Sequence, residues 1–97
     1  MDTYLIFRRN LCAPEDLPEV DRRSQAELDA RSDTVRKLRS YVFEEADGTL
    51  GTICIYDAIS EEAIRDHGAC ANVSVSEVVP ATAIDVHRPD PERLTVS

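Results

Sequence analysis

Alternation of apolar and polar residues is the clearest pattern along the chain. It occurs in the N-terminal "TYLIFRR" and in two longer stretches, residues 35–45 and 49–58. A period of two is typical of β-strands, because successive side chains point to opposite faces of a sheet. The Asp47–Gly48 pair lies between the two longer stretches. It predicts a tight hairpin turn, since glycine readily adopts the positive φ that such turns need.

A further strand-like stretch, "VSVSEVVPATAIDV", spans residues 73–86 and contains Pro80. Proline donates no backbone hydrogen bond, so this strand is expected at a sheet edge or with a bulge. The "HRPDPERLTVS" that follows is rich in proline and polar residues. It predicts a tail of residues 87–97 outside a domain of residues 1–86.

The segment after the first strand carries the signals of a surface helix. Asp16 and Glu19 have the spacing of a capping box, and Pro18 falls in the first turn, where its missing N–H costs little. The preceding "NLCAP" is expected to be a loop. The apolar positions form only a thin stripe: Leu17, Val20, Leu28 and Ala30, with Ser24 in its middle. Such a stripe predicts a helix with most of its circumference in water.

A second helix is predicted after Ser60, whose hydroxyl can cap it. Two glutamates follow in the first turn, where carboxylates favour the positive end of the helix dipole. The helix should end near Asn72, because asparagine tolerates the left-handed conformation of a helix end. The element order is then β-α-β-β-α-β. This predicts a ferredoxin-like α+β fold, with a four-stranded antiparallel sheet and both helices on one face.

Both faces of the predicted sheet are apolar. In the second strand, Leu38 and Val42 are expected on one face, and Tyr41 and Phe43 on the other. In the third strand, Ile53 and Ile55 are expected on the face opposite to that of Cys54 and Tyr56. Two helices cover only one face, and exposed apolar patches mark interfaces. We therefore expect a homodimer whose sheets face each other, a dimeric α+β barrel with a cavity inside. The alternative is that the segment from Thr82 folds back over its own sheet.

Charge and composition exclude several classes of function. The 97 residues include 19 acidic and 11 basic ones, for a net charge of −8. This argues against nucleic acid or anionic membrane as partner, because phosphate binding needs clustered Lys and Arg. No apolar run approaches the ~20 residues that span a bilayer. Three irregularly spaced cysteines make no disulfide framework, and "MDTYLIFRRN" is a poor signal peptide, so a cytoplasmic protein is expected.

Three stretches carry a family resemblance: "VRKLRSYV", "TICIYDAISEEAIRDHGA" and "SEVVPA". Over residues 35 to 79 they resemble the bacterial family called domain of unknown function 4242, small ferredoxin-like proteins of which some bind nickel. The matching positions are Ser40, Tyr41, Cys54, Tyr56, Ala58, Ala63, Ile64, Arg65 and His67. The resemblance implies a dimeric α+β barrel and a divalent-metal site that uses His67.

The chain also departs from this family. Where relatives carry Gly-Leu-Pro it has Asn72-Val73-Ser74, and the first-strand histidine of some relatives has no counterpart in "IFRRN". The turn into the last strand is therefore expected to differ from that of the relatives.

His67 and Cys70 lie three residues apart, on one face of the predicted helix. Imidazole and thiolate suit zinc, nickel or copper, but two ligands are an incomplete set. The others would come from Cys54, Asp66, His87 or a second subunit. The alternative is a hydrogen-bonded histidine at a helix end or lining the dimer cavity, with Cys70 beside it by chance.

Tyr41, Cys54 and Tyr56 are the candidates for lining a pocket between the facing sheets. Arg39 shares a face with Tyr41 and is a candidate for fixing an anionic ligand by a bidentate contact. The alternative is ordinary core packing and an exposed charge.

Two functions follow from these candidates: a nickel or other divalent-metal binder with His67 as ligand, or a small-ligand-binding, monooxygenase-like or isomerase-like barrel. A plain interaction module is the third. Hydrolase and kinase chemistry is not indicated, since no phosphate-binding glycine loop or nucleophile motif occurs.

Overall fold

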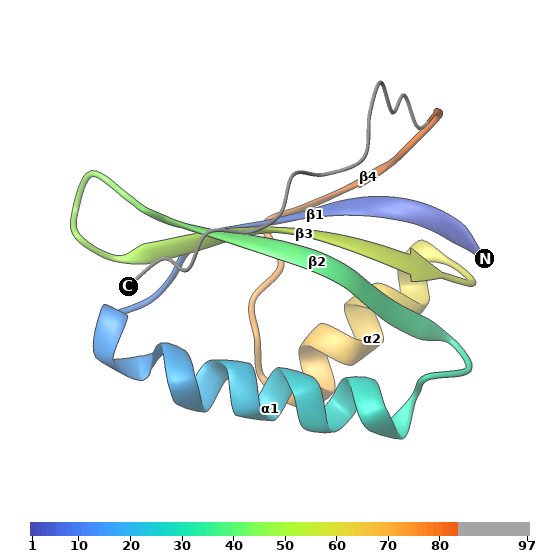
Figure 1. The fold of residues 1–97 in the computed structure, drawn as a ribbon, viewed down its shortest axis with the longest axis horizontal. Coiled ribbons are helices and arrows are strands. Elements are labelled where there is room, and N and C mark those ends of the chain that lie inside the picture. The colour runs from blue at the N-terminus through green and yellow to red at the C-terminus, as the bar shows by residue number, and fades with distance from the viewer. Residues whose placement is uncertain (84–97) are drawn as a thin grey trace, which may run out of the picture.

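The computed structural model describes residues 1–83, which form a four-stranded antiparallel sheet with two helices on one face (Figure 1). The elements are β1 Asp2–Cys12, the 3₁₀ turn η1 Pro14–Asp16, α1 Leu17–Ala30, β2 Val35–Glu44, β3 Leu50–Ala58, α2 Glu61–Ala71 and β4 Glu77–Pro80. The strands lie in the order β2-β3-β1-β4, and every neighbouring pair is antiparallel. The predicted ferredoxin-like fold is confirmed. The predicted boundary at residue 86 and the tail 87–97 lie outside the described residues.

Both ends of α2 form as the sequence predicts. The Ser60 hydroxyl accepts the backbone N–H of Ala63 at 3.1 Å, which satisfies one unpaired donor of the first turn. Asn72 closes the helix with φ 55° and ψ 48°, and the backbone N–H of Val73 then bonds the Gly68 carbonyl at 2.8 Å. The hairpin turn is also confirmed, since Gly48 has φ 87°.

The start of α1 differs from the prediction. Asp16 ends a 3₁₀ turn and makes no side-chain cap, so the helix begins at Leu17. Glu19 accepts instead from Nε and Nη2 of Arg22, at 2.8 and 2.6 Å. The predicted capping box is therefore wrong, because an arginine on the next turn holds the carboxylate.

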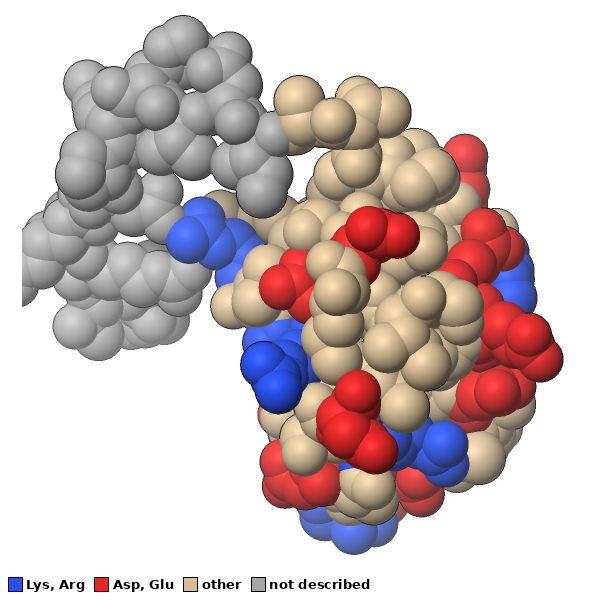
Figure 2. All heavy atoms as spheres, turned by 90° about the vertical axis from the view of Figure 1, so that its right-hand side faces the viewer, with Lys and Arg blue, Asp and Glu red and all other residues tan. Residues whose placement is uncertain are grey.

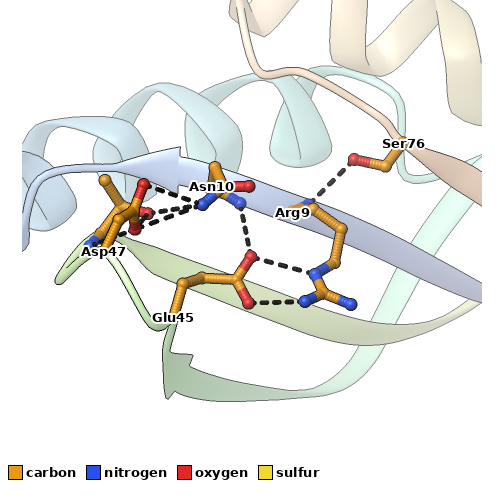
Figure 3. A network of polar contacts seen from close by, with 6 residues as sticks. Arg9, Asn10, Glu45, Asp47 and Ser76 are labelled. Atoms are coloured by element: carbon orange, nitrogen blue, oxygen red, sulfur yellow. Dashed lines mark hydrogen bonds and ion pairs between the residues drawn. The ribbon is translucent and has the colours of Figure 1, made fainter.

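β1 continues through the segment predicted as a loop, as far as Cys12. Its pairing with β3 shifts register between Arg8 and Cys12, and Asn10 has a positive φ of 49°. A network of polar contacts holds this irregular end against the β2–β3 hairpin (Figure 3). Glu45 accepts from the backbone N–H of Asn10 at 2.9 Å, and the Asn10 amide reaches Thr49 at 2.9 Å. These side-chain contacts are not visible in a pattern of alternation.

β2 contains a bulge that breaks its alternation. Lys37 lies opposite Tyr56 and Arg39 lies opposite Ile55, so Leu38 is an extra residue with no opposite partner. The alternation from which Leu38 and Val42 were expected on one face is therefore interrupted between them. Leu38 is 54% exposed.

The core lies between the helices and one face of the sheet. Its fully buried side chains include Ile6, Tyr56, Ile64 and His67. The stripe predicted for α1 is buried only in part. Val20, Ser24 and Leu28 are buried, whereas Ala30 is exposed.

β4 is shorter than predicted and pairs only with β1, at the edge of the sheet. Pro80 is its last residue and lies opposite Tyr4, which agrees with the edge position expected from the proline. Within residues 1–83, no helix combines the length and the hydropathy needed to cross a bilayer.

Charged side chains of both signs are mixed on the side of the molecule at which β1 begins. Figure 2 shows acidic and basic groups interspersed among uncharged ones over the described part of this side. This distribution differs from the continuous basic surface that binds phosphate backbones.

Candidate functional site

A cavity of about 370 Å³ lies between α1 and the helix-facing side of the sheet. Its lining is Arg8, Leu11, Leu17, Pro18, Val20, Asp21, Ser24, Lys37, Ser40, Val42, Thr52, Cys54, Tyr56 and Val73. The register explains the sheet residues in this set, because Cys54 of β3 lies opposite Ser40 of β2. The sequence predicts a pocket on the other face of the sheet, between two facing sheets. In the structure Cys54 and Tyr56 line a cavity on the helix-facing side instead.

Arg8 is the most unusual residue of this lining, because its guanidinium is buried and only partly paired. The residue is 2% exposed. Nη1 donates to Cys54 Sγ at 3.2 Å, and Cζ lies 5.7 Å from the centre of the Tyr56 ring. Nε and Nη2 have no hydrogen-bond partner of good geometry, although the Arg8 side chain also acts on the Tyr56 hydroxyl and opposes the rise in its pKa. Buried donors without partners are unfavourable by about 1–3 kcal/mol each, and more when the group is charged.

Cys54 is buried, as predicted, but its sulfur is part of a polar cluster. Sγ accepts from Arg8 and from the Ser40 hydroxyl at 3.1 Å, and the thiol lies 3.6 Å from Thr52 Oγ1. The residue is therefore more than a small apolar side chain in the core, because it supplies the acceptor that Arg8 Nη1 uses.

Tyr56 and His67 meet beneath the sheet. Their ring centres are 5.9 Å apart in an edge-to-face arrangement. Burial raises the pKa of the Tyr56 hydroxyl, which keeps it protonated. Burial also lowers the pKa of His67, so that the imidazole is neutral at pH 7.

His67 makes one hydrogen bond, between Nε2 and the Ser24 carbonyl at 3.1 Å. A carbonyl oxygen only accepts, so Nε2 carries the hydrogen and Nδ1 is left as an unprotonated acceptor. Nδ1 has no partner. This agrees with the alternative of a hydrogen-bonded histidine.

A metal site built on His67 does not fit the described residues. His67 is fully buried, whereas Cys70 is exposed, so the two predicted ligands do not converge. Among residues 1–83 no group of three His, Cys, Asp or Glu side chains could hold a metal ion. His87, another predicted ligand, lies outside the described residues.

Arg39 and Tyr41 lie on the opposite face of the sheet from the cavity. Arg39 Nη1 donates to the Tyr41 hydroxyl at 3.0 Å, and Tyr41 lies opposite Ile53 in the register. The structure thus separates these two predicted site residues from Cys54, Tyr56 and His67.

Arg8, Ser24 and Lys37 are cavity residues that the sequence interpretation missed. A signal for Arg8 exists, because the alternation that places Tyr4 and Ile6 on one face continues to Arg8. A charged residue at an inward position of a strand is a departure that points to a function.

Lys37 approaches Asp21 across the cavity, from β2 to α1. Its Nζ lies 3.8 Å from Asp21 Oδ1, and the two side chains are 21% and 60% exposed. The positive charge of Lys37 therefore has a local counter-charge, whereas that of Arg8 has none among the described residues.

Comparison with known proteins agrees with this fold. Residues 4–80 match the family described as "Nickel responsive protein SCO4226-like". This is a family of small ferredoxin-like proteins, as the resemblance implied, although its name is not domain of unknown function 4242. No curated protein matches the chain significantly.

Among solved structures, SCO4226 from Streptomyces coelicolor is similar with a TM-score of 0.63 at 14% identity, covering 86% of this chain and 99% of that one. SnoaB, a cofactor-independent oxygenase from Streptomyces nogalater, has a TM-score of 0.45 at 18% identity, with 92% and 100% covered. Rv0793 from Mycobacterium tuberculosis has a TM-score of 0.43 at 14% identity, with 91% and 100% covered.

Proposed function

The chain belongs to the SCO4226-like family of nickel responsive proteins, and we propose that it is a small ligand-binding protein. The proposed ligand is a small organic molecule that occupies the cavity between α1 and the sheet. The cavity itself, with Arg8 partly unpaired in its wall, is the observation that carries this proposal.

The size and lining of the cavity support binding of an organic molecule. Its volume of about 370 Å³ lies in the range of small-molecule sites, roughly 300–1,000 Å³. Leu17, Val20 and Val42 supply apolar surface, and Ser40 and Thr52 supply hydroxyl groups. Apolar walls with a few placed polar groups are typical of such sites, since the polar groups orient a ligand that apolar contacts hold.

NMR titration of the ¹⁵N-labelled protein with 3-phenylpropanol tests the cavity. We expect shifts confined to the lining, and we expect Val42→Phe to abolish them because the added ring fills the space. Leu38→Phe is the matched control, since it enlarges an exposed residue of the same strand that does not line the cavity. Equal binding by wild type and Val42→Phe would contradict the proposal.

The family description favours nickel binding as a second candidate function. His67 is the predicted ligand, but among the described residues it belongs to no group of three potential ligands. A nickel site would therefore need groups from outside residues 1–83 or from a second copy of the chain. Nickel titration of wild type and His67→Ala tests this candidate, and identical stoichiometry and affinity would exclude His67.

We also propose that the protein is a homodimer formed through the sheet face that carries Tyr41. Phe7, Ile53 and Ile55 lie on this face by register, and α1 and α2 cover the opposite one. Tyr41 is 49% exposed, which supports an interface there. The oxygenase or isomerase alternative stays a prediction.

A further inference from the structure

We propose that Arg8 is the carboxylate-binding residue of the cavity, and that the ligand is a monocarboxylate with an apolar body. This inference rests on the proposed function, because it names the class of molecule that the cavity holds.

The unpaired edge of Arg8 is suited to a carboxylate. Nη1 is used by Cys54, which leaves Nε and Nη2 without partners. These two nitrogens lie along one edge of the guanidinium, where their N–H bonds run parallel and match the two oxygens of a carboxylate.

The neighbouring arginine shows how such an edge is used in the same molecule. Arg9 donates from Nε and Nη2 to the two carboxylate oxygens of Glu45, at 2.9 and 2.8 Å (Figure 3). Arg8 points to the other face of β1 and presents the same pair of donors beneath the sheet. There, no carboxylate of the described residues forms an ion pair with it.

The charge balance of the cavity also favours an anionic ligand. Lys37 is paired with Asp21, so Arg8 carries the uncompensated positive charge of the lining. Buried charges in proteins are normally paired, because an isolated charge in a low-dielectric interior is strongly unfavourable. A ligand carboxylate would supply the missing charge and both missing acceptors.

The apolar residues Leu17, Val20 and Val42 define the body of the ligand. The remaining polar groups include the Ser40 and Thr52 hydroxyls and the Lys37–Asp21 ion pair, which carries no net charge. A second ionised group on the ligand, placed against the apolar residues, would therefore lack a partner. We therefore infer a single carboxylate on an alkyl or aryl body. Nε and Nη2 are closed to water in the unliganded chain, so the proposal requires the guanidinium to turn toward the cavity when the carboxylate binds.

The experiment compares acids with neutral alcohols of the same shape, by NMR titration of the full chain. The probes are octanoate with 1-octanol, and 3-phenylpropionate with 3-phenylpropanol. At least one acid should bind about tenfold or more tightly than its alcohol, and the Arg8 Nε–H signal should shift on addition of the acid. Arg8→Met should remove the preference. Arg36→Met, the loss of an exposed arginine outside the cavity, should keep it.

The outcomes separate the carboxylate site from the cavity. Equal affinity for acids and alcohols, or an acid preference that survives in Arg8→Met, overturns the role of Arg8 and leaves the cavity proposal standing. Binding of none of the four probes overturns both. Should Arg8→Met fail to fold, Arg8→Lys serves instead, since it keeps the charge but lacks the paired donors and should lose most of the preference.

Discussion

Replacing Arg8 by methionine should leave the unliganded protein about as stable as wild type, although Arg8 is among its most buried residues. Methionine follows the shape of the arginine stem and carries no hydrogen-bond donor. The substitution removes two buried donors that lack partners, a gain of about 1–3 kcal/mol for each. It also removes the bond to Cys54 and the contact with Tyr56. These losses are worth about 1.5–3 and 0.5–2 kcal/mol respectively.

The two sets of contributions nearly cancel, so the free energy of unfolding should change by less than about 1.5 kcal/mol, in either direction. Urea denaturation followed by circular dichroism measures this difference, with the m-value as a check that both proteins unfold in the same way. Arg8→Ala is the contrasting variant, and it should lose about 2–5 kcal/mol because it leaves a void. A loss above about 3 kcal/mol in Arg8→Met with an unchanged m-value would refute the reasoning, since it would mean that Nε and Nη2 are stabilised in the unliganded protein.

Three further predictions concern other parts of the molecule. Burial lowers the pKa of His67 in the folded protein. On acidification the unfolded chain therefore binds a proton at a higher pH than the folded protein does. Stability should therefore fall as the pH drops below about 6.5, by at most about 1.4 kcal/mol per pH unit, and His67→Gln should remove this component from denaturation curves recorded between pH 7 and 5. Tyr41→Asp should convert the proposed dimer to a monomer in light scattering, because it places a charge in the apolar interface. Ile59→Asp, at a similarly exposed apolar residue between β3 and α2, should not, and a dimer in both variants would place the interface elsewhere. The hydrogen bond from Arg9 lowers the pKa of Glu45, so its contribution is present above pH 4.5 and is lost as the pH falls through the folded-state value. Glu45→Gln should accordingly melt at a lower temperature than wild type at pH 7, and the gap should close on acidification; a gap independent of pH would show that the carboxylate charge is not responsible.

The order and type of the elements could be predicted from the sequence, because local signals determine them. Ser60, Asn72 and Gly48 act on their own turns, and alternation within a strand needs no partner to be recognised. The bulge at Leu38 could not be predicted in this way, since an extra residue is defined only by the opposite strand. The bulge interrupts the alternation on which the face expected for Leu38 depends.

The candidate site was predictable only in its individual residues. Cys54, Tyr56 and His67 were recognised and do lie close together, but Arg39 and Tyr41 lie on the other face. The register places the two sets on opposite faces of the sheet, so one pocket cannot be lined by both. The cavity between two facing sheets stays a prediction. Nothing in a strand pattern shows that the packing of α1 leaves a hollow, because that depends on side-chain volumes across two layers.

Arg8 illustrates why the strongest functional signal of this chain was also a departure from the fold pattern. A domain of this size is stable by only about 5–15 kcal/mol. Two unpaired donors within its core therefore use a substantial share of that stability. An apolar residue at this position would continue the face begun by Tyr4 and Ile6 and would avoid the loss. The presence of arginine is explained most directly if the unliganded chain is only one of its two states, and if the missing partner is a carboxylate that arrives with the ligand.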